Sequence, residues 1–207
     1  LDYFSKEEAN EIIQRAKKKN VKLIITNGTN PEANRKALEL SESFTEVKPA
    51  LGIYPIEALD LSDKEIDAEI AFIRSKKGDI VAIGEVGMDF KVSQEKEKQT
   101  SNLTKFINLS KELDKPIIVH SRKAEAECVT HLERLKAEKV IMHVFSAKLK
   151  LVEQVIKNGW SLSIPANVKR SEHFQHVIKM TPITQLFCET DAPFLSPNKE
   201  EKNEPEN

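Results

Sequence analysis

Cysteine and glycine are scarce in this sequence, and an excess of charge of one sign is almost absent. There are two Cys and six Gly among 207 residues, and 32 Lys and Arg against 33 Asp and Glu leave a formal net charge of −1. Two cysteines without a CxxC spacing argue against a disulfide scaffold and indicate a reducing compartment, so we expect a cytoplasmic protein. The balanced charge argues against binding nucleic acid by bulk electrostatics, although it permits a local nucleic-acid site.

Long hydrophobic runs are also missing. No apolar run approaches the roughly 18 residues that a membrane helix needs, and residues 1–7 contain no signal-peptide core. We therefore expect no contact with a membrane. A composition of 39% hydrophobic and 31% charged residues excludes the disordered and low-complexity classes. The length predicts a single domain over residues 1–207, at roughly 150 residues per domain.

Short β-branched runs alternate with longer segments of helical period along the whole chain. Each run is an almost continuous apolar stretch, which is typical of a parallel strand covered on both faces. The predicted strands are Val21–Thr26, Val47–Ile53, Ile80–Gly84, Pro116–His120, Val140–Val144, Trp160–Ile164 and Gln185–Glu189.

The segments between these runs carry helix start signals. Capping boxes begin at Ser5 and Ser62, and Asn30 precedes a proline at the first helical position. Gly78 and Gly159 are predicted to end the helices before them. Further helices are predicted at 93–113, 123–137, 147–158 and 171–180.

Strict alternation of strand and helix predicts a parallel α/β sheet, either doubly wound or closed as a barrel. Seven strands are one fewer than a (β/α)₈ TIM-type barrel contains. The chain opens on a helix and ends after a strand and a loop. We therefore expect a TIM-type barrel that lacks its first strand and last helix, and so a domain incomplete at both ends.

Four ligand-type side chains fall at the carboxyl ends of successive predicted strands, where barrel enzymes build their sites. They are Glu85, His120, His143 and Asp191. Two imidazoles and two carboxylates suit Zn²⁺, Mn²⁺ or Mg²⁺, so their positions alone predict a metal site. Asp89 is predicted either to orient a neighbouring group or to cap its own loop. Glu189 precedes Asp191 by two residues in extended chain, so it is expected to support the ligands from behind.

Five sequence blocks occur in the order found in one known family. They are Leu51–Pro55, Gly84–Asp89, Pro116–Arg122, His143–Ser146 and Glu189–Pro193. With these blocks the whole chain resembles the TatD-related metal-dependent hydrolases, a deoxyribonuclease-like branch of the amidohydrolase superfamily. Asn203-Glu204-Pro205 also matches an N-E-P sequence of that family.

The resemblance implies a role for each ligand. Glu85 would bridge two divalent cations, His120 and His143 would bind one, and Asp191 would bind the other near the attacking water. Glu85 and Asp191 would be the catalytic pair, because a metal-activated water attacks the scissile bond.

Four further residues in the matching blocks are implied to bind substrate: Tyr54, Ser121, Arg122 and Ser146. Among them Arg122 directly follows the ligand His120 and Ser121, and a guanidinium can hold a phosphate through two hydrogen bonds.

The sequence departs from the family pattern in three places. The H-x-H pair of the family's first strand has no counterpart in these residues, Tyr54 stands where the family often has His, and Ala147 replaces a common Gly. Without the H-x-H pair, the cation that Asp191 is implied to bind lacks two of its ligands. With Tyr rather than His at position 54, the resemblance implies no acid–base role for that residue.

The resulting hypothesis is a divalent-metal-dependent hydrolase that cleaves DNA phosphodiester bonds, with contacts to DNA confined to the metal cleft. One alternative is an ester or amide hydrolase such as a D-aminoacyl-tRNA deacylase-like enzyme, since metal-activated water attacks carbonyl carbon as well as phosphorus. Another is a non-catalytic relic, if the H-x-H pair is truly absent. A monomer is expected, and the choice between endo- and exonuclease stays open.

Overall fold

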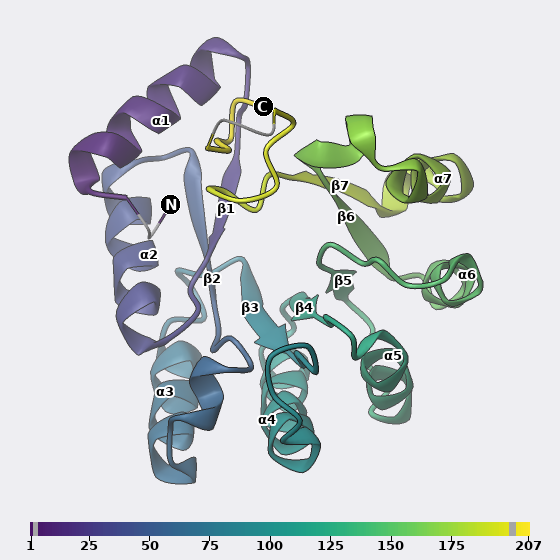
Figure 1. Ribbon diagram of the computed structural model, residues 1–207. Helices are drawn as coiled ribbons and strands as arrows, with labels where there is room; N and C mark the ends of the chain where they lie inside the picture. Colours follow the sequence, from purple (N-terminus) through teal and green to yellow (C-terminus); the bar gives the residue numbers. More distant parts are fainter. Residues whose placement is uncertain (2–3, 199–201) are drawn as a thin grey trace.

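The computed structural model describes residues 1, 4–198 and 202–207, and its centre is one curled sheet of seven parallel strands (Figure 1). The strands are hydrogen-bonded in chain order, so each strand lies beside the next strand in the sequence. Their bounds are β1 Ile24–Asn27, β2 Val47–Leu51, β3 Ala82–Gly87, β4 Ile117–His120, β5 Val140–Met142, β6 Ser161–Pro165 and β7 Leu186–Glu189.

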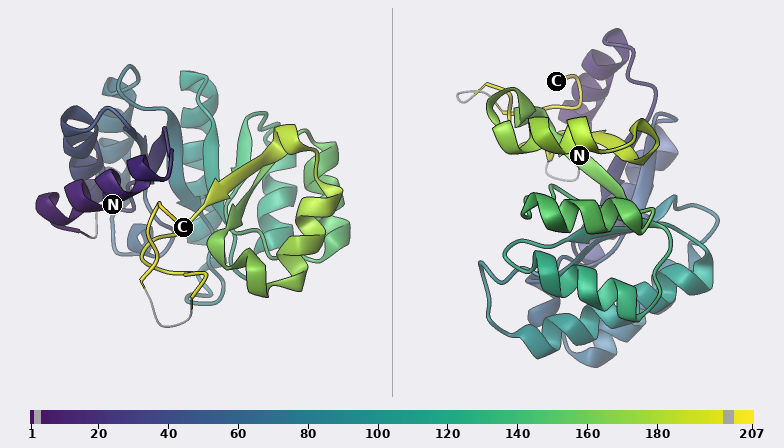
Figure 2. Two further views of the ribbon diagram at one scale, coloured as in Figure 1. Left: turned by 90° about the horizontal axis from the view of Figure 1, so that it is seen from above. Right: turned by 90° about the vertical axis from the view of Figure 1, so that its right-hand side faces the viewer.

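Helices follow the strands and cover the outer side of the curved sheet (Figures 1 and 2). The α-helices are α1 Lys6–Lys18, α2 Pro31–Ser43, α3 Asp63–Ser75, α4 Lys96–Leu113, α5 Glu125–Arg134, α6 Leu149–Lys157 and α7 Glu172–Met180. Three short 3₁₀ turns lie at η1 Glu57–Leu59, η2 Ala166–Arg170 and η3 Ile183–Gln185. No helix in the described part of the chain is long and apolar enough to span a membrane.

The structure confirms the TIM-type α/β class and every predicted strand and helix, with boundaries shifted by a few residues. Gly159 follows α6 with a φ of 74°, as a helix-ending glycine should. The prediction for Gly78 was wrong. Helix α3 ends at Ser75. The backbone N–H of its C-cap, Lys76, already donates to carbonyls of the last helical turn, and Gly78 lies in the turn that follows.

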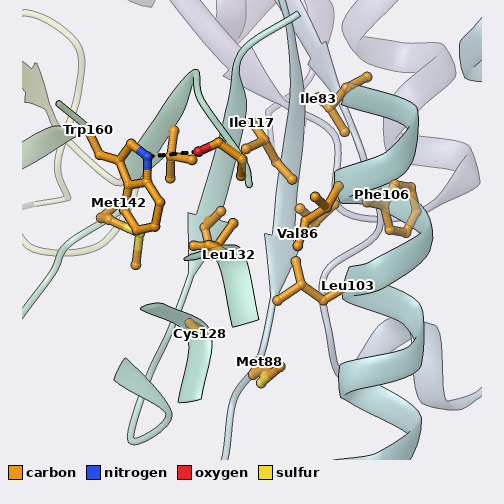
Figure 3. Close-up of a cluster of buried hydrophobic side chains, with 14 of the residues drawn as sticks. Ile83, Val86, Met88, Leu103, Phe106, Ile117, Cys128, Leu132, Met142 and Trp160 are labelled. Carbon is orange, nitrogen blue, oxygen red and sulfur yellow. Dashed lines mark hydrogen bonds between the residues drawn. The ribbon is translucent and has the colours of Figure 1, made fainter. Parts of the chain in front are cut away.

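The main core lies between the sheet and its helices (Figure 3). Leu103 and Phe106 of α4 pack toward Ile83 and Val86 of β3, and all four are essentially buried. Trp160 is also buried and donates its indole N–H to the carbonyl of Ala137 at 3.0 Å. Large apolar side chains on both partners fix how far each helix stands from the sheet, and hence where the strand ends lie.

A polar bracket joins α2 and α3 to the loop after β2. Asn34 is fully buried and exchanges two hydrogen bonds with the backbone of Gly52, at 2.9 and 3.1 Å. Its amide also donates to the buried carboxylate of Glu69 at 2.7 Å, and the Arg35 guanidinium pairs with the same carboxylate. The bracket therefore fixes a loop at the carboxyl end of the sheet.

Replacing Asn34 with alanine should destabilise the fold strongly. The change leaves the buried N–H and C=O of Gly52 without partners, which costs about 2–4 kcal/mol in the free energy of unfolding. Urea denaturation monitored by circular dichroism measures the difference. Arg74→Ala is the control, because the Arg74–Glu112 pair is exposed and should contribute little. Equal losses in the two variants would contradict this account of the bracket.

Candidate metal centre

Three of the predicted ligands meet at the carboxyl end of the sheet. Glu85 lies in β3, His120 is the last residue of β4 and His143 follows β5. The Glu85 carboxylate lies 2.8 Å from Nδ1 of His120 and 3.8 Å from Nε2 of His143. One donor atom from each residue lies within 4.8 Å of the other two, an arrangement that can hold a metal ion. Parallel strands in sequence order bring these positions together.

Asp191 lies beside this trio in the loop after β7. Its Oδ1 is 3.4 Å from Nε2 of His143, the nitrogen that faces Glu85. The side chain of Asp191 is 32% exposed, whereas that of Glu85 is 12% exposed. Asp191 therefore stands at the solvent side of the cluster, within reach of water.

A glycine lets β3 approach His120 closely. Gly87 pairs with His120 across the β3–β4 ladder and has a φ of 146°, a conformation that other residues rarely adopt. A Cβ at this position would lie 1.9 Å from the carbonyl oxygen of His120. Glycine is therefore required here to bring Glu85 and His120 to hydrogen-bonding distance.

A buried carboxylate holds His120 from behind. Asp89 is fully buried and its Oδ2 lies 3.1 Å from Nε2 of His120. The Tyr54 hydroxyl donates to the same oxygen at 2.7 Å, and the backbone N–H groups of Lys91 and Val92 donate to Oδ1. Burial raises the pKa of Asp89, but these hydrogen bonds outweigh it and lower the pKa to about 2. Asp89 thus does both of its predicted tasks: it orients His120 and caps its loop.

A second carboxylate holds His143 in the same way. Oε2 of Glu189 lies 2.5 Å from Nδ1 of His143 and accepts a hydrogen bond from the Ser163 hydroxyl at 2.6 Å. Its Oε1 accepts from the backbone N–H of Val144 at 3.1 Å. With Nδ1 engaged, Nε2 of His143 points toward Glu85 and Asp191, as the supporting role expected for Glu189 requires.

The cluster contains more carboxylates than cations. The two imidazoles are surrounded by four carboxylates, those of Glu85, Asp89, Glu189 and Asp191. Within residues 1, 4–198 and 202–207, none of the four forms an ion pair with Lys or Arg. Burial lowers the pKa of His143, but Glu85 and Glu189 outweigh it and raise that pKa well above its usual value. The site therefore favours added positive charge, and its nitrogen and oxygen donors fit a divalent cation.

The four residues implied to bind substrate differ in their exposure and in their contacts. Tyr54 hydrogen-bonds to Asp89, and its ring lies edge-on to His120 with centroids 5.0 Å apart, so it supports the predicted ligand His120. Ser121 is buried in the turn after β4, whereas Arg122 and Ser146 are exposed. The Arg122 guanidinium forms no ion pair with any residue that the structure describes, which leaves it available for an anion.

A cavity of about 660 Å³ opens beside the cluster and is lined by Glu85, His143 and Asp191. Asn27 and Ser163 also line it, and neither was predicted from the sequence. Asn27 lies at the carboxyl end of β1, and its buried Oδ1 has no hydrogen-bond partner among the residues that the structure describes. The signal that predicted the ligands, a polar side chain at a strand end, also applies to Asn27.

The chain is similar to proteins of one family along its whole length. The family model described as TatD related DNase matches residues 1–207. Human deoxyribonuclease TATDN3 is 33% identical over 212 residues, covering 97% of this chain and 77% of that protein. An uncharacterized metal-dependent hydrolase of Methanocaldococcus jannaschii is 36% identical over 197 residues, covering 95% and 77%. The crystal structure of YjjV, a TatD homologue from Escherichia coli K12, matches with a TM-score of 0.87 at 27% identity, covering 97% of this chain and 80% of that one.

Removing either supporting carboxylate should weaken metal binding. Asp89→Asn and Glu189→Gln keep the size of the side chain but remove the charge behind His120 or His143, which typically lowers metal affinity about 10–100-fold. Isothermal titration with Mn²⁺ or Zn²⁺ measures the dissociation constant. Asp63→Asn, which alters an exposed carboxylate paired with Lys105, is the control and should change nothing. Unchanged affinity in both supporting variants would contradict this description of the centre.

Proposed function

The chain belongs to the TatD related DNase family and is a metal-dependent hydrolase, and from this premise we propose that it cleaves phosphodiester bonds in DNA. The observation that carries the proposal is the cluster of Glu85, His120 and His143, of which Glu85 and His143 are buried, with Asp191 beside it. We propose these four residues as the ligands of up to two divalent cations, with Zn²⁺, Mn²⁺ and Mg²⁺ all compatible with the donor set.

The chain's own residues have separate tasks in this reaction. Glu85 faces both imidazoles and is suited to bridge two cations. Asp191 is the more exposed carboxylate, so it can accept a proton from the attacking water at Oδ1. A bound divalent cation would activate that water and neutralise charge developing on the phosphate.

Arg122 is suited to orient the substrate. It lies two residues after His120, the last residue of β4, is exposed, and can offer two parallel N–H donors to one phosphate. The formal net charge of −1 favours DNA contacts confined to this cleft rather than spread over a basic face. We propose a monomer as the working unit.

Two other functions are less well supported. Ester or amide hydrolysis, as in a D-aminoacyl-tRNA deacylase-like enzyme, would use the same ligands, but the human relative is named a deoxyribonuclease. A non-catalytic relic does not account for two histidines that are each still held in place by a carboxylate. DNA cleavage is therefore the favoured function.

Changing the proposed catalytic carboxylates should abolish cleavage without unfolding the protein. Asp191→Asn removes a proton acceptor, and such groups contribute about 10²–10⁴-fold to kcat; Glu85→Gln should cost at least as much. Cleavage of a labelled oligonucleotide and of an aminoacyl ester, each with Mg²⁺ or Mn²⁺ and then with EDTA, measures rate and substrate class. Wild-type rates in both variants would disprove the proposed site, and selective turnover of the ester would disprove the proposed substrate.

Arg122→Ala should raise KM for the oligonucleotide about tenfold or more, since a hydrogen bond to a charged group contributes about 1.5–3 kcal/mol. Arg122→Lys should recover only part of the loss, because lysine cannot form the two-pronged contact. Steady-state kinetics separate KM from kcat. Arg74→Ala, at the end of α3, is the matched control and should leave KM unchanged. A KM unaffected by Arg122→Ala would show that this residue does not hold the phosphate.

A further inference from the structure

The segment 203–207 includes the N-E-P sequence and has no task in the proposed reaction so far. Figures 1 and 2 show it between α1 and β7, on the side where the two ends of the sheet face each other. Its last three residues line the same cavity as Glu85, His143 and Asp191. The segment is thus close enough to the candidate metal centre to influence the position of its side chains.

One side of the segment is fastened to α1. The Arg15 guanidinium donates to both carboxylate oxygens of Glu204, from Nε at 2.8 Å and from a terminal nitrogen at 2.9 Å. Glu206 adds a more distant contact to the same Arg15, at 3.7 Å. A two-pronged pair of this kind fixes orientation as well as distance.

The other side is fastened to the loop that carries Asp191. Asn203 is completely buried, and its side-chain amide donates to the carbonyl of Thr190 at 2.5 Å. Its backbone N–H donates to the carbonyl of Pro193 at 3.0 Å. Asn203 therefore holds the chain on both sides of Asp191, within two residues of it.

Asp191 needs such support because its backbone is in the left-handed region, with a φ of 56°. Most residues other than glycine are disfavoured in this region by about 1–2 kcal/mol; aspartate adopts it more readily than most, and its surroundings decide whether it stays there. Among the residues that the structure describes, the Asp191 side chain makes one ion-pair contact, the 3.4 Å approach to Nε2 of His143. The hydrogen bonds from Asn203 supply a fixed frame for the loop.

We propose that Arg15, Asn203 and Glu204 are positioning residues that hold the Asp191 carboxylate in place for metal binding. The inference rests on the proposed function, since it takes Asp191 as a metal ligand. The Arg15–Glu204 pair holds Asn203, Asn203 holds the loop at Thr190 and Pro193, and the loop presents Asp191 beside His143. A helix far from the centre in sequence thereby sets the geometry of one ligand.

The test is a metal titration of Glu204→Gln, which keeps the side chain's size and removes its charge. Binding of Mn²⁺, measured by calorimetry and by the electron paramagnetic resonance of the bound ion, should weaken about tenfold, as for other groups that orient ligands. In DNA cleavage, kcat should fall while KM changes little, because the substrate contact at Arg122 is untouched. Arg15→Lys should give a smaller loss, and the double swap Arg15→Glu with Glu204→Arg should restore part of the affinity.

The chain offers a matched control in the exposed pair of Arg74 and Glu112. Arg74 donates to both oxygens of Glu112 at 2.6 and 2.9 Å, the same two-pronged geometry between α3 and α4. Glu112→Gln should leave Mn²⁺ affinity and kcat unchanged. Thermal melting of every variant separates a loss of stability from a loss of metal affinity.

The outcomes separate this inference from the proposed function. If Asp191→Asn weakens Mn²⁺ binding but Glu204→Gln and Arg15→Lys do not, the positioning role is wrong and the ligand assignment stands. If Asp191→Asn itself leaves Mn²⁺ binding unchanged, the ligand assignment fails and the inference fails with it. Weakened binding in Glu204→Gln with an unchanged Glu112→Gln supports the positioning role.

Discussion

Each histidine of the candidate metal centre is held by a carboxylate, and the rest of the site depends on these two pairings. Asp89 engages one nitrogen of His120, and Glu189 engages one nitrogen of His143. An imidazole with one nitrogen engaged in this way presents the other nitrogen in a fixed direction. The other nitrogen of each imidazole faces Glu85, so both histidines are already oriented as a shared cation would require.

The curled parallel sheet makes this arrangement possible. Asp89 follows β3 and holds the histidine of β4, while Glu189 at the end of β7 reaches back to the histidine after β5. The second contact joins residues 46 positions apart and skips over β6, whose Ser163 donates to the same carboxylate. The inner face of the curve therefore brings together side chains that a flat sheet would keep two strands apart.

Much of the fold and the trio of Glu85, His120 and His143 could be predicted, because both follow from local rules. Apolar runs mark buried strands, alternation with helices makes them parallel, and parallel strands place their carboxyl ends together. The contacts of Tyr54 with Asp89 and of Ser163 with Glu189 could not be predicted, because a rule for strand ends does not say which side chains hydrogen-bond to each other. Such contacts depend on the curvature of the sheet and on side-chain directions, which no pattern along the chain encodes. The predicted helix end at Gly78 was wrong by a few residues, because α3 ends at Ser75 with Lys76 as its C-cap.

The excess of carboxylates at the centre also affects the folding equilibrium of the whole chain. Gathering Glu85, Asp89, Glu189 and Asp191 at one end of the sheet, with two of them buried, costs electrostatic free energy that the unfolded chain does not incur. A cation that binds the folded chain alone stabilises it by mass action, by about 2.7 kcal/mol at a hundred times its dissociation constant. Metal supply would then control how much folded protein a cell contains, as well as how fast that protein works.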